Sequence, residues 1–182
     1  MANIAPVPVE AIEDAELRQL IERCQRLGVP DTLFPRILAH VPHYAKALLH
    51  AMLQSHADGS VDHKLKEIVR VRLAEIAGDG YFSALRSNAA LAAGLTERDI
   101  EAARAAEASA RFSAAERCAL RYAENMYRAP DQVDAAFYAE MKRHFSEAQI
   151  MELGAFIAFH YGMQVFMRTL EARPLAQHSG SP

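Results

Sequence analysis

Residues 62–100 read DHKLKEIVRVRLAEIAGDGYFSALRSNAALAAGLTERDI, and the rest of the chain is interpreted from this stretch. Apolar residues recur at helical spacing over 64–77, and Asp62 precedes them as an N-cap residue. The Gly-Asp-Gly corner at 78–80 interrupts the pattern, which resumes over 81–93. The stretch therefore predicts two helices joined at a tight corner.

Helix signals continue on both sides of these two helices, and no stretch alternates as a half-buried strand does. Capping boxes, in which a hydroxyl residue precedes an acidic or amide residue by three positions, begin at Thr96, Ser113 and Ser146. The signals predict an all-α chain of about eight helices. The expected helical segments are 10–27, 33–40, 42–55, 64–77, 81–93, 97–107, 114–127, 134–145 and 147–171.

The composition suits one folded domain. Hydrophobic residues make up 51% of the 182 residues and charged residues 24%, which is enough apolar material for a sizeable core. No internal linker interrupts the helix signals. We therefore expect one domain over 1–173, followed by a disordered tail over 174–182.

Charge and cysteine usage exclude several classes of protein. The net charge of −3 gives no basic excess for nucleic acid. We find no apolar run of the roughly 18–20 residues that span a bilayer, and the N-terminus does not resemble a signal peptide. Cys24 and Cys118 form neither a metal-type spacing nor a disulfide framework. We expect a cytoplasmic protein without a membrane, nucleic-acid or metal partner.

The segment 147–171 predicts the assembly. Its apolar residues leave almost no polar face, and a helix that is apolar all round is buried centrally or shared with another subunit. We therefore expect a homo-oligomer.

Residues 62–100 resemble the carboxymuconolactone decarboxylase and alkylhydroperoxidase D-like superfamily. The similarity extends from about 34 to 170 and includes RILAHVPHYAKALLHAML, FSAAERCALRYAENM and the helix that begins at Ser146. The resemblance implies an all-α, AhpD-like bundle with a helical hairpin at its active site, and a trimeric or hexameric assembly.

The same resemblance locates the candidate chemistry. Peroxidase members carry a Glu, a CxxC motif that starts twelve residues later, and a His four residues after the second Cys. On this chain those positions hold Glu67, Asp79, Phe82 and Arg86, and Tyr81 precedes the second cysteine position. Neither Asp nor Phe supplies a thiol. The chain is therefore interpreted as a divergent member without a CxxC peroxidase site.

Each catalytic candidate also has a structural interpretation. Glu67 can act as a general acid or base, with a pKa raised by burial, or form an i,i+3 ion pair with Arg70 on the surface. Arg86 can clamp a carboxylate or make an interface ion pair, and we expect its side chain to meet Glu67 at one end of a cleft. Tyr81 can donate a hydrogen bond to a substrate, and His160 can move a proton, or both can be core residues.

The candidate substrate contacts are residues of the same region: Asp79, Phe82, His63 and His43. Asp79 can equally be an ordinary turn residue. The histidine-rich stretch contains HVPH, but Pro42 interrupts the helix there, so no metal geometry is set. No phosphate-binding glycine loop is present, so neither a metal nor another cofactor is expected.

These observations leave three hypotheses. The first is a cofactor-free acid/base enzyme of the decarboxylase-like lyase type, acting on a small organic acid or lactone. The second is a scaffold or binding protein that has lost the chemistry. The third is a thiol peroxidase that uses the displaced Cys24 and Cys118. Convergence of Glu67, Arg86 and His160 on one cavity would favour the first over the second.

Overall fold

The computed structural model describes residues 2–105 and 111–174, and these residues form helices and no strand. The all-α prediction is confirmed. The short 3-10 helices are η1 (Val9–Ala11) and η2 (Pro130–Gln132). The α-helices are α1 (Ala15–Leu27), α2 (Leu33–Leu38), α3 (Pro42–Ala57), α4 (His63–Ala77), α5 (Gly80–Ala84), α6 (Asn88–Ala92), α7 (Glu97–Arg104), α8 (Ala114–Arg128), α9 (Ala135–Met141) and α10 (Glu147–Thr169).

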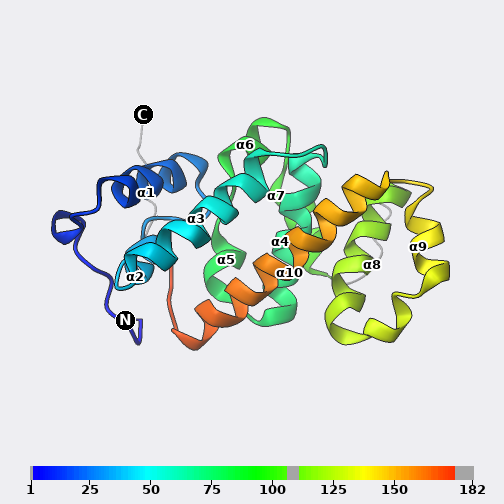
Figure 1. Ribbon diagram of the computed structural model, residues 1–182. Coiled ribbons are helices and arrows are strands. Elements are labelled where there is room, and N and C mark those ends of the chain that lie inside the picture. Colours follow the sequence, from blue (N-terminus) through cyan, green and yellow to red (C-terminus); the bar gives the residue numbers. More distant parts are fainter. Residues whose placement is uncertain (1, 106–110, 175–182) are drawn as a thin grey trace.

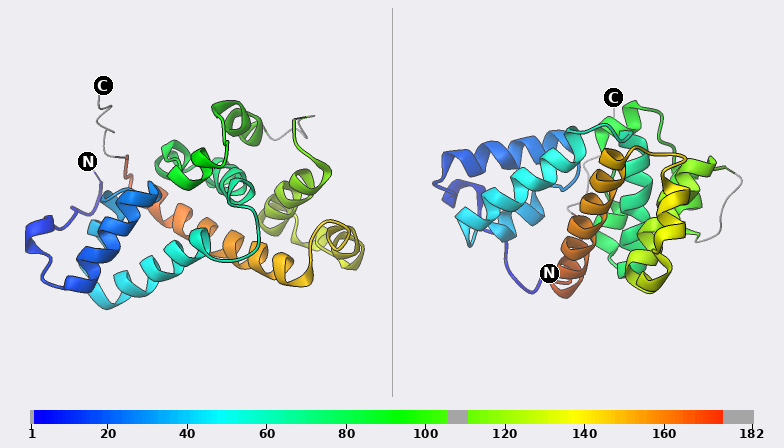
Figure 2. Two further views of the ribbon diagram at one scale, coloured as in Figure 1. Left: turned by 90° about the horizontal axis from the view of Figure 1, so that it is seen from above. Right: turned by 45° about the vertical axis from the view of Figure 1, so that its right-hand side comes forward.

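Helices α4 and α10 form the centre of the molecule (Figure 1). Helices α1, α2 and α3 lie at one end, and α8 and α9 lie at the other, as Figure 2 also shows. Buried apolar side chains form two clusters. One joins α1–α3 to α5 and the last turns of α10, and the other joins α4 and α6–α9 to the first half of α10. Because α10 contributes to both clusters, it ties the two ends together.

Helix α10 is only partly covered in one copy of the chain. Leu153 and Ile157 are fully buried, but Met151 is 71% exposed and Phe166 is 41% exposed. By length and hydropathy α10 could cross a bilayer, so the expectation that no segment reaches that size is wrong. The central helix of a soluble protein meets the same criterion, so this property by itself assigns no membrane role.

The capping signals predicted most helix starts. All three predicted capping boxes form, and the Asp62 side chain accepts a hydrogen bond from the backbone of Leu65 at the start of α4. The first helix begins at Ala15 rather than at residue 10, because Asp14 caps it and η1 precedes it. Helices α2, α9 and α10 end earlier than expected. The predicted end of the helix over 97–107 lies outside the described residues, as does the predicted tail over 174–182 apart from Pro174.

The largest error concerns the second helix of the hairpin. The predicted continuous helix over 81–93 is wrong, because the structure divides it into α5 and α6. Leu85 and Ser87 between them are extended, and the Ser87 hydroxyl accepts from the Ala90 amide to start α6 anew. Side chains from α4 stabilise this break, because they form hydrogen bonds with its backbone groups.

Candidate functional site

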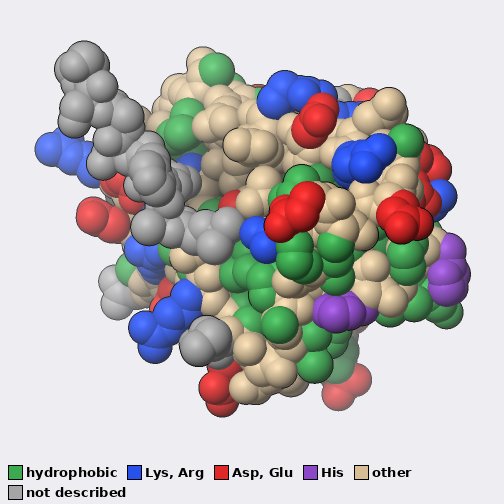
Figure 3. All heavy atoms as spheres, turned by 90° about the vertical axis from the view of Figure 1, so that its left-hand side faces the viewer, with side chains coloured by type: hydrophobic (Ala, Val, Ile, Leu, Met, Phe, Trp, Pro, Cys, Tyr) green, Lys and Arg blue, Asp and Glu red, His purple; other side chains and the backbone are tan. Residues whose placement is uncertain are grey.

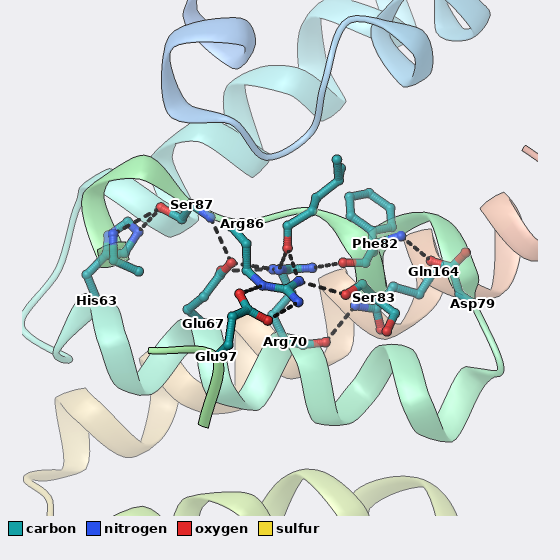
Figure 4. A network of polar contacts seen from close by, with 12 residues as sticks. His63, Glu67, Arg70, Asp79, Phe82, Ser83, Arg86, Ser87, Glu97 and Gln164 are labelled. Atoms are coloured by element: carbon teal, nitrogen blue, oxygen red, sulfur yellow. Dashed lines mark hydrogen bonds and ion pairs between the residues drawn. The ribbon is translucent and has the colours of Figure 1, made fainter. Parts of the chain in front are cut away.

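Glu67 and Arg70 form a fully buried ion pair on α4, beneath α5 and α6 (Figure 4). Arg70 Nε donates to Glu67 Oε2 over 2.8 Å, and Arg70 Nη2 donates to Glu67 Oε1 over 2.6 Å. In such a bidentate pair, two parallel N–H groups of the guanidinium each bind one carboxylate oxygen. The i,i+3 pair is therefore present as its spacing allows, but it lies inside the protein and not on its surface.

The same two side chains bind the backbone between α5 and α6. Arg70 Nη1 donates to the Phe82 carbonyl over 2.5 Å, and Arg70 Nη2 donates to the Leu85 carbonyl over 2.8 Å. Glu67 Oε1 also accepts from the Ser87 amide over 2.9 Å. These bonds replace those of a continuous helix, which explains why the hairpin breaks at this point.

The ion pair determines how Glu67 titrates. Burial alone would raise the pKa of Glu67, but the charge and hydrogen bonds of Arg70, with the Ser87 amide, outweigh it and lower the pKa to about 2. The expectation of a raised pKa is therefore wrong. Glu67 is ionised and fully engaged near neutral pH, which suits a structural anchor better than a proton donor.

Arg86 does not meet Glu67. Its Nε and Nη2 bind the carboxylate of Glu97 on α7 over 2.8 and 3.0 Å, and its Nη1 binds the carbonyls of Ser83 and Leu85. The expected Glu67–Arg86 pair is wrong, because Arg70 lies one turn from Glu67 on the same helix and occupies its carboxylate.

Asp79 lies at the corner between α4 and α5 and caps α5. Its carboxylate accepts from the amides of Tyr81 and Phe82 over 3.0 and 3.1 Å, and burial raises the pKa of Asp79. The corner borders a polar groove of about 700 Å³. The charged side chains that line this groove are Asp79, Arg168, Glu171 and Arg173.

Tyr81 and Phe82 are core residues. The Tyr81 hydroxyl donates to Asp31 and accepts from the Phe34 amide, and burial raises the pKa of Tyr81 well above its ordinary value. The Phe82 ring packs edge-on against Phe34. Neither side chain lines the groove beside Asp79.

His160 belongs to a cluster of three imidazoles, in which His56 and His160 are buried and His63 is half-buried. Its ring centroid lies 4.8 Å from that of His56, which lies 5.6 Å from that of His63. His160 Nε2 is 3.1 Å from Ser55 Oγ, and His63 Nε2 is 2.7 Å from Ser87 Oγ. Burial lowers the pKa of His56 to about 3 and that of His160 well below its ordinary value, so both rings are neutral near pH 7.

Sequence reasoning missed His56 as a member of this cluster. The density of histidines over 40–63 was the signal, but it did not say which of them point inward. His43 is exposed on α3 beside Tyr44. Histidine side chains reach the surface on the face of the molecule that Figure 3 shows. His43 therefore lies outside the imidazole cluster.

Glu67, Arg86 and His160 do not converge on one cavity. Glu67 is bound by Arg70, Arg86 is bound by Glu97, and His160 contacts Ser55. Within the described part of the chain, no group of three His, Cys, Asp or Glu side chains is arranged to hold a metal ion. The site thus consists of a closed hairpin, a polar groove at its corner and a separate imidazole cluster.

The two cysteines are also apart and poorly suited to thiol chemistry. Cys24 belongs to the cluster around α1–α3, and Cys118 belongs to the cluster around α8. Burial raises the pKa of Cys24 to about 12 and raises that of Cys118. Because the thiolate is the nucleophile, these environments oppose reactivity.

Residues 42–125 match the model of the carboxymuconolactone decarboxylase family. No curated protein matches the chain. This match and the helical fold described above support the resemblance to the carboxymuconolactone decarboxylase and alkylhydroperoxidase D-like superfamily.

Solved structures share the fold over nearly the whole chain. The debrominase Bmp8 aligns with a TM-score of 0.79 and 19% identity, covering 95% of this chain and 92% of that one. The alkylhydroperoxidase AhpD core of a peroxidase-related protein from Ralstonia eutropha gives 0.80 and 17%, covering 97% and 93%. A peroxidase-related protein from a Silicibacter species gives 0.79 and 16%, covering 96% and 93%. A variant of the debrominase is in complex with 2,3,4-tribromopyrrole.

Proposed function

We propose that this chain is a binding member of its superfamily, in which the hairpin is a scaffold and the groove beside Asp79 takes a small organic acid. One observation carries the proposal: the polar groups of the hairpin are occupied by one another. The Glu67–Arg70 pair is closed by backbone groups, and Arg86 is held by Glu97. No group of this network is left to attack a substrate or to exchange a proton with it near neutral pH.

The groove supplies the contacts for such a ligand. Arg168 lies against the corner, where its Nη1 donates to the Ala77 carbonyl over 2.9 Å, and Arg173 is exposed nearby. Guanidinium groups bind carboxylates through paired hydrogen bonds. Because Asp79 and Glu171 line the same groove, the ligand should carry a hydroxyl or amino group beside its carboxylate. Binding of a small molecule by the debrominase supports this use of the fold.

Calorimetric titration with malate, a small hydroxy acid, tests this proposal. Arg173→Gln should weaken malate binding about tenfold or more, because a charge-assisted hydrogen bond is lost. Arg128→Gln removes an exposed arginine outside the groove and is the matched control. Absence of malate binding, or equal affinity of the two variants, would contradict the proposal.

A second candidate is a cofactor-free lyase of the decarboxylase type that acts on a small organic acid or lactone in the same groove. It is supported by Asp79, which lies at the corner with a pKa raised by burial and occupies the first cysteine position of the resemblance. Asp79 would then move the proton while Arg168 and Arg173 hold the carboxylate. Asp79→Asn keeps a capping side chain, so it should remove turnover while binding persists.

Assembly and location are proposed on separate grounds. The exposed apolar side chains of α10, which include Met151, Val165 and Phe166, suit a face covered by a second copy of the chain. We propose a homo-oligomer, trimeric or hexameric as the resemblance implies, in the cytoplasm. A monomer in light scattering at micromolar concentration would contradict the assembly.

A further inference from the structure

A second pocket, separate from the groove beside Asp79, lies where the end of α3 meets the middle of α10. Its volume is about 390 Å³, within the range of small-molecule sites. Most of its wall is apolar and comes from Ala51, Ala155, Phe156 and Phe159. Two phenylalanines in so small a site favour a ligand with an aromatic ring.

Ser55 gives this pocket one specific polar contact. Its Oγ donates to the Met52 carbonyl over 2.8 Å and lies 3.1 Å from His160 Nε2. Because the single hydroxyl hydrogen is used on the carbonyl, His160 Nε2 carries the proton and donates to Ser55 Oγ. One lone pair of Ser55 Oγ then remains, and it can accept a hydrogen bond from a donor group of a ligand in the pocket.

A polar cluster lies directly behind the apolar wall. Within the described chain, both ring nitrogens of His56 and Nδ1 of His160 are buried without a hydrogen-bond partner. The Phe156 ring separates them from the pocket, at 4.1 Å from His160 and 5.5 Å from His56 between ring centroids. Unpartnered buried polar groups are rare in folded proteins and occur where a ligand or a function accounts for them.

The charges around the pocket exclude an anionic ligand. The ammonium group of buried Lys66 donates to the carbonyls of Ser55 and Asp58 and to Glu152 Oε1, at 2.9, 2.8 and 2.6 Å. Its positive charge is therefore compensated, and the exposed carboxylate of Asp58 remains at the rim. An organic acid would meet a negative rim without a free cation among the described lining residues.

We propose that this pocket binds a small neutral aromatic molecule whose O–H or N–H group donates to Ser55 Oγ, with His160 as the positioning residue for Ser55. The ligand class differs from the acid proposed for the groove beside Asp79. The two proposals therefore stand or fall separately.

Three probes test the chemistry on the unmodified full-length protein by calorimetric titration. Phenol provides the ring and the donor, anisole provides the ring without a donor, and benzoate provides the ring with a negative charge. Phenol should bind saturably at one site per chain. Anisole and benzoate should each bind about tenfold or more weakly, since one loses the hydrogen bond and the other meets the acidic rim. Equal affinities for phenol and anisole, or no phenol binding, would overturn the proposal without any variant.

Two variants place the site. Ser55→Ala should reduce phenol affinity to that of anisole and leave anisole unchanged, which also shows that the variant is folded. Thr169→Val is the matched control, because the Thr169 hydroxyl makes the same bond to the carbonyl three residues earlier, at 2.6 Å, on α10 outside the pocket. Unchanged phenol affinity in Ser55→Ala, or an equal loss in Thr169→Val, would refute this site.

His160→Phe tests positioning. It should lower the preference for phenol over anisole while leaving anisole affinity unchanged, because only the orientation of the Ser55 lone pair is lost. A uniform loss for both probes would show that His160 merely shapes the pocket and would overturn its positioning role.

Discussion

The hairpin and the α3–α10 crossing both bury polar side chains, but they satisfy them very differently. At the hairpin, Glu67 and Arg70 are hydrogen-bonded to each other and to the backbone of the break between α5 and α6. At the crossing, His56 and His160 leave three ring nitrogens without partners in the described chain. In the region expected to be catalytic, the polar side chains bind one another and make the hairpin rigid. The three ring nitrogens that lack partners in the described residues lie instead at the α3–α10 crossing.

The largest expected effect comes from removing Arg70 from its buried pair with Glu67. Arg70→Leu leaves the Glu67 carboxylate and two hairpin carbonyls buried without their donor, so it should cost about 3–5 kcal/mol of unfolding free energy. Urea denaturation measures this loss. The double variant Glu67→Leu and Arg70→Leu removes both charges and should recover part of it. A loss below about 1 kcal/mol for the single variant would mean that the pair is not anchoring the hairpin.

Acid should destabilise the folded protein through His56 and His160. In the unfolded chain these histidines bind protons near their ordinary pKa of 6.5, but in the folded protein the pKa of His56 is about 3 and that of His160 is also lowered. Below pH 6.5 the unfolded state therefore binds more protons, and stability falls as pH decreases toward 3. Each histidine should contribute about 1.4 kcal/mol per pH unit. Denaturation curves between pH 7 and about 4 check this, and His56→Leu should flatten the slope. An unchanged slope would show that His56 is not desolvated.

An intermediate effect is expected where the two regions touch. The Ser87 hydroxyl is hydrogen-bonded to His63 Nε2 and also caps α6. Ser87→Ala should therefore lower the free energy of unfolding by about 1–2 kcal/mol. Ser60→Ala at an exposed turn is the control and should stay within about 0.5 kcal/mol. Thermal unfolding compares the two variants, and equal melting temperatures would contradict a capping role.

The smallest effect is expected at Arg86. Its carboxylate partner Glu97 has a side chain that is 64% exposed, so Arg86→Leu should cost only about 0–1 kcal/mol. Denaturation and malate titration on the same variant check this. A loss as large as that of Arg70→Leu would show that Arg86 anchors the hairpin as Arg70 does.

Local signals predicted most of the fold, and contacts between distant segments account for what they missed. Capping boxes and cap residues mark helix starts because they act within one turn of chain. The break between α5 and α6 has one local signal, the cap residue Ser87, but it also depends on hydrogen bonds from Arg70 on another helix. Propensity alone favours a continuous helix there.

The candidate site divides in the same way. The i,i+3 spacing of Glu67 and Arg70 indicated their contact, but only packing could show that both are fully buried. Conversely, the interpretation of Arg86 as a clamp depended on a hairpin geometry that the break removes. The meeting of His56 with His160 requires α3 to lie against α10, and no periodicity within either helix encodes it.

The position of Lys66 has a consequence for labelling chemistry. The chain has four lysines, and Lys66 alone combines 1% side-chain exposure with a triad of acceptors, whereas Lys46, Lys64 and Lys142 are all more exposed. A reagent that acylates free amines should therefore modify those three lysines quickly and Lys66 only when α3 separates from α10. The rate of Lys66 acylation, followed peptide by peptide with mass spectrometry, therefore measures how often that crossing opens.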